Sequence, residues 1–243
     1  MKKLALSAFV VAGFMFTSCK DDDNNTTEEG TVDISKMYLP LKITADDYTT
    51  IYTYNNKGQV TKIVESDGYE YIFNYSGNQL VEVINIDDTY KTTYTFTQSG
   101  TKLTLNMKGE FNGQTQTDSE ELTLDSKGNL INDGYFTYSY DANGNIVKMA
   151  SDDGEEIKLT FDSKNGIFKN LNLPKWISTY ILENQTNLVN NTLSVNLTSE
   201  DFPEDNFSGT VKYEYNADNY PVKLESSSSS NETYSQTIEY TKK

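Results

Sequence analysis

The sequence predicts an all-β fold, an antiparallel up-and-down meander that closes into a barrel or barrel-like sheet. Three observations support this prediction: apolar residues alternate with polar ones over much of the chain, turn motifs of one chemical type recur, and the connections between them are short. The 243 residues include 18 Tyr and 11 Phe, enough aromatic side chains to build a core.

The strands are predicted from period-2 alternation, in which every second side chain is apolar. In residues 69–75, for example, Tyr69, Tyr71, Phe73 and Tyr75 alternate with other residues. Similar runs cover residues 90–97, 103–107, 157–161 and 193–197. One apolar and one polar face is typical of half-buried antiparallel strands. Most of these runs are roughly five to eight residues long, the usual length of strands in globular proteins.

The turns between the strands share one form: an Asx residue, two small or polar residues, and Gly. It occurs at residues 55–58, 125–128 and 141–144, with variants at 162–166 and 216–219. An Asx side chain accepts hydrogen bonds from the backbone ahead of it, and Gly adopts the left-handed conformation that completes the turn. Each motif therefore predicts a tight hairpin.

Further turn signals cut residues 38–162 into about a dozen short strands. Additional strands are expected to begin near residues 191, 209, 220 and 232, with Ser226–Ser230 as a hairpin tip. Short loops make neighbours in sequence neighbours in space. Such a meander must curl to cover its apolar face and to remove its edges.

One segment, residues 174–183, breaks the strand pattern and predicts a short helix. Trp176 and Tyr180 are four residues apart, as are Ile177 and Ile181, and Pro174 suits a first helical turn. We expect this helix to plug one end of the barrel. Trp176 and Tyr180 are also candidates for a ligand-binding platform, although aromatic residues more often pack in a core.

Residues 1–18 have the form of an export signal. A basic start is followed by a short apolar run, residues 4–16, which is too short to span a bilayer. Ser18 and the lone Cys19 then resemble the bacterial lipobox, although Phe16 stands where Leu is usual. The resemblance implies that residues 1–18 are a signal peptide and that Cys19 is lipidated, which would anchor the chain to a membrane.

The residues after Cys19 resemble the acidic export signal of Bacteroidota lipoproteins: Lys20, Asp21, Asp22 and Asp23. That resemblance implies a lipid-anchored protein of the outer membrane that faces the cell exterior. Residues 19–35 lack apolar periodicity, so we predict a lipidated, disordered acidic tether, followed by a single domain over residues 36–243.

Composition excludes several functions. The chain contains no His and no Arg, which excludes Ser-His-Asp and Cys-His mechanisms and zinc sites that contain His. Its net charge of −16 makes nucleic acid an unfavourable partner. No cofactor motif and no metal site are predicted, because the acidic loop that begins at Asp141 lacks the Gly and Glu spacing of a calcium loop. We predict no catalytic residue, since acidic pairs such as Glu120-Glu121 and Asp152-Asp153 arise by chance among 36 acids.

The recurring Tyr/Phe-Asx-x-x-Gly hairpins are similar to YD-type repeats of bacterial surface proteins. The whole layout resembles an uncharacterised Bacteroidota surface lipoprotein family described as having a porin-like fold. This resemblance implies a barrel and brings no catalytic residues. We expect the barrel to lie outside the membrane, because the strands are short for a membrane span and the chain ends in Lys243 instead of an aromatic residue.

Together these observations predict a non-enzymatic cell-surface lipoprotein that binds a ligand or a partner. Candidate partners are a glycan, a peptide or an outer-membrane protein. Two alternatives stay open: a glycan hydrolase that uses two carboxylates, and an accessory subunit of an outer-membrane complex.

Overall fold

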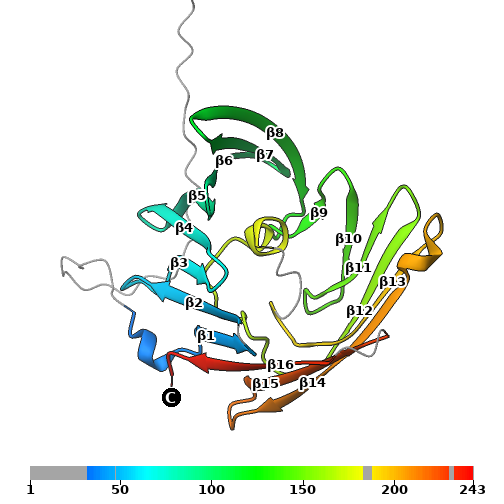
Figure 1. The fold of residues 1–243 in the computed structure, drawn as a ribbon. Helices are drawn as coiled ribbons and strands as arrows, with labels where there is room; N and C mark the ends of the chain where they lie inside the picture. The colour runs from blue at the N-terminus through cyan, green and yellow to red at the C-terminus, as the bar shows by residue number, and fades with distance from the viewer. Residues whose placement is uncertain (1–31, 47, 183–187, 230–232, 243) are drawn as a thin grey trace, which may run out of the picture. The chain divides into compact units, whose positions relative to one another are not determined.

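Sixteen antiparallel strands form a closed barrel in the computed structural model, which describes residues 32–46, 48–182, 188–229 and 233–242 (Figure 1). This confirms the predicted fold class. Each strand pairs with the next, and β1 pairs with β16 to close the ring. The strands are β1 Pro40–Ala45, β2 Tyr48–Tyr54, β3 Val60–Glu65, β4 Tyr69–Ser76, β5 Gln79–Asp87, β6 Tyr90–Ser99, β7 Lys102–Phe111, β8 Gln114–Leu124, β9 Leu130–Asn132, β10 Phe136–Tyr140, β11 Ile146–Ser151, β12 Glu155–Phe161, β13 Thr192–Ser199, β14 Phe207–Tyr215, β15 Pro221–Ser228 and β16 Thr233–Tyr240.

Residues 31–243 form one compact unit, and the predicted signal peptide, Cys19 and the acidic residues 20–23 lie outside the described residues. Part of the predicted tether is ordered. Val32 donates a backbone hydrogen bond to Asn56, and Asp33 caps a 3-10 helix, η1, at Ile34–Lys36. The ordered chain therefore begins before residue 36. No helix among the described residues is long and apolar enough to cross a bilayer.

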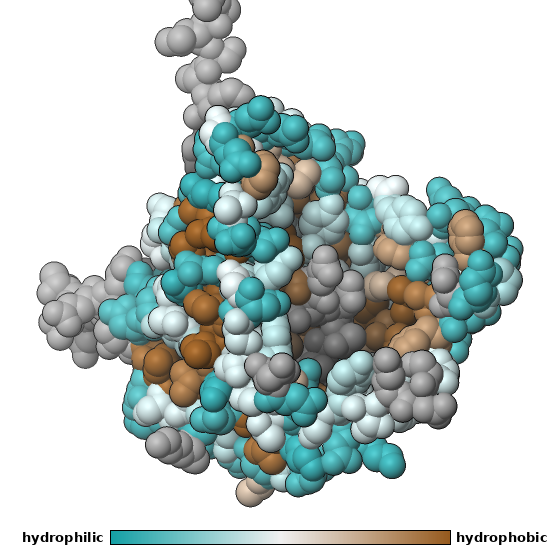
Figure 2. All heavy atoms as spheres, in the orientation of Figure 1, coloured by the Kyte–Doolittle hydropathy of each residue, from teal (hydrophilic) through white to brown (hydrophobic). Residues whose placement is uncertain are grey.

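The two faces of the wall differ sharply. The inner face carries the apolar core, with side chains such as Val60, Val83 and Leu105 fully buried. The outer face carries ion pairs between neighbouring strands, including Lys62–Glu70 at 2.8 Å and Lys91–Glu110 at 3.3 Å. In Figure 2 hydrophilic residues cover much of the outer rim, and hydrophobic residues gather inside it. The period-2 alternation of the sequence thus separates core from surface.

Connections alternate between the two ends of the barrel, as an up-and-down order requires. All of the predicted Asx–Gly turns lie at one end, which we call the plugged end; they follow β2, β8, β10, β12 and β14. The opposite end, which we call the open end, holds shorter hairpin turns such as those at Gly68, Gly113 and Gly154. Both Val32 and Tyr240 lie at the plugged end, since β1 starts there and β16 finishes there.

The segment between β12 and β13 runs inside the barrel, where Figure 1 shows its short coil within the ring of strands. We call its described residues, 162–182 and 188–191, the plug. The predicted helix is present within it, but its main turn is a π-helix, Ile177–Ile181, closed by a hydrogen bond from Leu182 N to Ile177 O. A sixteen-stranded barrel is too wide for wall side chains alone to fill, so an internal segment completes the core.

Two strand predictions need correction. β6, β7 and β8 contain 10, 10 and 11 residues, longer than the predicted runs of five to eight. The first half of β8, residues 114–119, is entirely polar, which hides the alternation there. Ser226–Ser228, predicted as part of a hairpin tip, instead belongs to β15 and pairs with β14 and β16.

Candidate functional site

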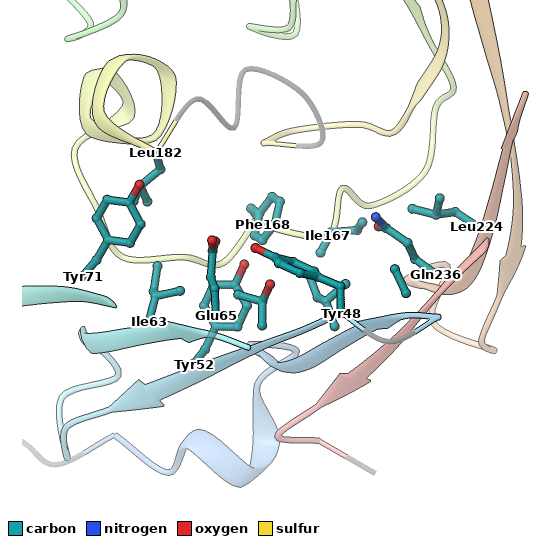
Figure 3. A pocket seen from close by; sticks show the side chains of 13 residues that line it. Tyr48, Tyr52, Ile63, Glu65, Tyr71, Ile167, Phe168, Leu182, Leu224 and Gln236 are labelled. Atoms are coloured by element: carbon teal, nitrogen blue, oxygen red, sulfur yellow. The ribbon is translucent and has the colours of Figure 1, made fainter. Parts of the chain in front are cut away.

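A cavity of about 320 Å³ lies in the lumen between the plug and the wall formed by β1 to β4, β15 and β16 (Figure 3). We call it the luminal pocket. Its lining combines aromatic, aliphatic and a few polar side chains: Ile43, Ala45, Tyr48, Thr50, Tyr52, Ile63, Glu65, Tyr71, Ile167, Phe168, Leu182, Leu224 and Gln236. A concave site that combines apolar and aromatic walls with a few placed polar groups is a usual form of a small-molecule site.

Strand alternation brings these side chains together. Tyr48, Thr50 and Tyr52 occupy alternate positions of β2, so all three face the lumen. Glu65 lies opposite Thr50 on β3. The plug supplies the far side of the pocket through Phe168, whose ring centroid is 6.1 Å from that of Tyr52. Figure 3 shows the β2 and β3 side chains rising toward Phe168 and Ile167.

The Tyr52 side chain is buried and offers a hydroxyl group to the pocket. Only 4% of the residue is exposed, and among the described residues its hydroxyl has no hydrogen-bond partner. Burial, followed by the nearby Glu65 carboxylate and Tyr48, raises the pKa of Tyr52, so the phenol stays protonated. The hydroxyl oxygen itself is not fully buried, so it opens onto the cavity and is available to a ligand.

Glu65 supplies the carboxylate of the pocket. Burial, followed by the interaction of its hydroxyl with this carboxylate, raises the pKa of Tyr48. Among the described residues no lysine forms an ion pair with Glu65. On the outer face of the neighbouring strand, by contrast, Glu70 binds Lys62 at 2.8 Å. The negative charge in the pocket therefore lacks a cationic partner.

The two residues predicted as ligand-binding candidates lie elsewhere in the plug. Trp176 is 4% exposed and packs edge-on against Phe96, with ring centroids 4.9 Å apart. It also borders a cleft of about 750 Å³ at the plugged end. Tyr180 donates a hydrogen bond to Glu120 of β8, and burial followed by this carboxylate raises the pKa of Tyr180. Both side chains tie the plug to the wall, and neither lines the luminal pocket.

The turns at the plugged end contain the predicted hydrogen bonds to the Asx side chain and, in addition, a bond to a buried Asn that the motif did not predict; we call this arrangement an Asx lock. Asp141 Oδ1 accepts hydrogen bonds from the backbone N–H groups of Asn143, Gly144 and Asn145, and Oδ2 accepts one from the Asn145 amide at 2.9 Å. Burial acts to raise the pKa of Asp141, but these hydrogen bonds outweigh it and the pKa is lowered. Asn145 is only 4% exposed. The same arrangement joins Asp125 to buried Asn129.

This geometry indicates that the loop at Asp141 is a turn and not a calcium loop, because its carboxylate accepts hydrogen bonds from N–H groups of the turn. Within the described part of the chain, no group of three or more Asp, Glu or Cys side chains is placed to hold a metal ion. The acidic pairs considered for hydrolysis also separate. Glu120 faces the lumen, while Glu121 faces outward and binds Lys102. Neither the luminal pocket nor the cleft beside Trp176 is lined by two carboxylates.

Sequence reasoning missed the luminal pocket because its lining comes from six strands and a distant insertion. The available signal was the alternation of Tyr48, Thr50 and Tyr52 on one face of a strand. Placing that face against Phe168 would have required knowing how the sheet closes.

No family model and no curated protein matches the chain. Among solved structures, it is similar to a porin-like protein from Bacteroides vulgatus, at 9% identity and a TM-score of 0.43, over 83% of this chain and 98% of that one. It is also similar to a porin-like protein from Bacteroides uniformis, at 13% identity and a TM-score of 0.44, over 87% of this chain and 99% of that one.

Proposed function

We propose that this protein is a lipid-anchored cell-surface barrel that binds a small ligand in its luminal pocket without transforming it. The observation that carries the proposal is the pocket itself: aromatic walls, a carboxylate and the unpartnered hydroxyl of buried Tyr52 meet in a cavity of about 320 Å³. That volume lies at the lower end of the range for small-molecule sites, roughly 300–1,000 Å³.

The charged residues of the outer face favour a barrel that is surrounded by water. A membrane-spanning barrel presents an apolar band to lipid, and a lysine there costs roughly 2–4 kcal/mol near the bilayer midplane. Here lysine–glutamate pairs recur around the circumference, on β3–β4, β6–β7, β7–β8, β11–β12 and β14–β15. Attachment through an acylated Cys19 accounts for a membrane location without a spanning wall.

The position of the chain ends also supports this arrangement. Val32 binds Asn56 at the plugged end, and Lys242 binds Asp218 at the same end. The chain ahead of Val32 therefore enters the barrel at its plugged end, whereas the luminal pocket is lined by residues nearer the other end, such as Ala45 and Glu65.

The anchor is tested by metabolic labelling of cells with a radioactive fatty acid. The native protein should carry the label and fractionate with the outer membrane, and Cys19→Ser should lose both properties. A native protein without label would overturn the anchoring part of the proposal.

Ligand binding is tested by thermal-shift screening of the purified chain against neutral sugars, short peptides, amines and carboxylates. Thr50→Phe should fill the pocket and abolish every shift, because Thr50 is 8% exposed and lines the cavity. Thr53→Phe, on the outer face of the same strand, is the matched control and should keep them. Shifts that survive Thr50→Phe, or a screen with no shift at all, would contradict a luminal site.

A further inference from the structure

We propose that the luminal pocket selects a small organic ammonium ion, with Glu65 as its counter-charge and the surrounding tyrosine and phenylalanine rings as its walls. This inference rests on the proposed ligand-binding function and names the ligand class. Four features of the barrel lead to it: where lysines lie, where acids lie, how the plug lysines are used, and what the pocket offers.

Lysines of the wall lie on its outer face. Each of them lies on the face of its strand that points away from the buried apolar residues. Lys62, for example, is next to buried Ile63 in sequence, and Lys102 is next to buried Leu103. The lysines of the described strands that follow this rule are Lys42, Lys62, Lys91, Lys102, Lys108, Lys148, Lys158, Lys212 and Lys223.

Acidic residues, in contrast, occur on both faces. Those whose strand position faces the lumen are Glu65, Asp87, Asp118, Glu120 and Glu155. Two of them accept hydrogen bonds from tyrosine hydroxyls: Glu120 from Tyr180, and Glu155 from Tyr135 at 3.2 Å. A tyrosine hydroxyl stabilises a carboxylate without neutralising it. The inner wall is therefore anionic, and a concave, low-dielectric surface focuses such a field.

The lysines of the plug are committed at the plugged end. Lys175 donates a hydrogen bond to Asn129 at 3.1 Å, and Lys169 donates one to Asn165 at 2.8 Å. Lys164 lies over the ring of Tyr215, 3.9 Å from its centroid. Across the described residues, no lysine lines the luminal pocket. The counter-charge for Glu65 must come from what binds there.

The pocket suits a cation that also carries apolar surface. Aromatic rings attract a cation that lies over their faces within about 6 Å, and the attraction grows as the site is desolvated. Tyr48, Tyr52, Tyr71 and Phe168 provide such rings around Glu65. The unpartnered Tyr52 hydroxyl can accept a hydrogen bond from the N–H group of a primary ammonium ion, or from a hydroxyl group of the ligand. An anion would be repelled by the negative charge of Glu65. A strongly hydrated metal ion would gain no binding energy from the aliphatic walls.

Calorimetric titration with matched probes tests this inference. One pair is choline and its uncharged isostere 3,3-dimethyl-1-butanol, and the other is benzylammonium and benzyl alcohol. We expect at least one cation to bind to the native chain about tenfold or more tightly than its neutral partner, and more weakly as salt rises. Neutral probes that bind as well as the cations, or two cations that do not bind, would overturn the inference.

A charge-matched pair of variants locates the effect. Glu65→Gln should weaken binding of the cation by about tenfold or more, because it removes the counter-charge inside the pocket. Glu82→Gln removes a charge of the same sign from the outer face of β5, where Glu82 lies near Asn74, and should change binding by less than about twofold. Equal losses in both variants would show a general charge effect and would contradict a role for Glu65.

The outcome also separates this inference from the proposed function. A neutral sugar or peptide that binds to the native chain and is lost in Thr50→Phe would keep the luminal site and reject the cationic ligand class. A chain that binds neither these probes nor any compound of the screen would reject both.

Discussion

The plugged end and the open end of this barrel are built from the same strands but serve different purposes. At the plugged end, Asx–Gly turns lock onto buried amides such as Asn129 and Asn145, and the plug packs against the wall through Trp176. At the open end, the turns are short and exposed, as at Asp152. The difference shows how one repeated hairpin can concentrate stabilising contacts at one end of a barrel, while residues nearer the other end, such as Ala45 and Glu65, line the luminal pocket.

The largest effect should come from the plug. Trp176→Ala removes a ring that is 4% exposed and contacts Phe96, so we expect a loss of about 3–5 kcal/mol in the free energy of unfolding. Phe202→Ala at the open end, where the residue is 58% exposed, should change it by less than about 0.5 kcal/mol. Urea unfolding followed by circular dichroism measures both, and equal losses would abolish the distinction between the ends.

The Asx locks should come next. Asp141→Ala leaves three backbone N–H groups and the amide of buried Asn145 without their acceptor, which should cost about 1–3 kcal/mol. Asp152→Ala changes an exposed aspartate in an open-end turn and should cost less than about 0.5 kcal/mol. A loss at Asp152 as large as that at Asp141 would contradict the account.

The glycine of the lock should have a smaller effect. Gly128 has φ +77°, and a Cβ there would meet no atom within 4 Å, so Gly128→Ala tests the conformation alone. We expect a loss of about 1 kcal/mol. Gly128→Asn should lose less, because Asn219 occupies the corresponding position of the last such turn with φ +62°. Differential scanning calorimetry should rank the two variants in that order; the reverse order would mean that φ does not determine the loss.

The smallest effect concerns how the free energy of unfolding depends on acidic pH. Hydrogen bonds to Asp125 and Asp141 lower the pKa of both carboxyls in the folded chain, although burial acts in the opposite direction. Because the folded pKa lies below the unfolded value, the stabilisation is complete above about pH 4 and is lost as pH falls through the folded pKa. Replacing both with Asn should flatten the fall of unfolding free energy below that pH, whereas Asp152→Asn should leave its slope unchanged. An unchanged slope in the double variant would reject this source of acid sensitivity.

Much of the fold follows from local patterns. Alternation at residues 69–75 predicts β4, the Asx–Gly motifs predict the turns at the plugged end, and Pro174 with Trp176 predicts the helical turn of the plug. Other features depend on contacts between distant residues. Asn145 follows a turn and looks like a surface residue, but the closed barrel brings Asn190 of the plug against it and buries both.

The site was less predictable than the fold for the same reason. Trp176 and Tyr180 were the visible aromatic candidates, yet their partners, Phe96 and Glu120, hold the plug in place. The pocket depends on which strands the plug touches inside the barrel, and neither alternation nor turn chemistry contains that information.

The central claim is that one face of each strand is turned into a packed lumen and the other into water. Thiol reactivity on one strand tests it most directly. In a Cys19→Ser background, Val83→Cys and Val81→Cys place a thiol at a buried and an exposed position of β5, where 0% and 40% of the native residue are exposed. The account predicts that Val81→Cys reacts with a water-soluble maleimide at the rate of a free thiol, while Val83→Cys reacts at that rate only in urea. Equal reaction of both thiols in the folded protein, or protection of position 81 instead of position 83, would contradict it.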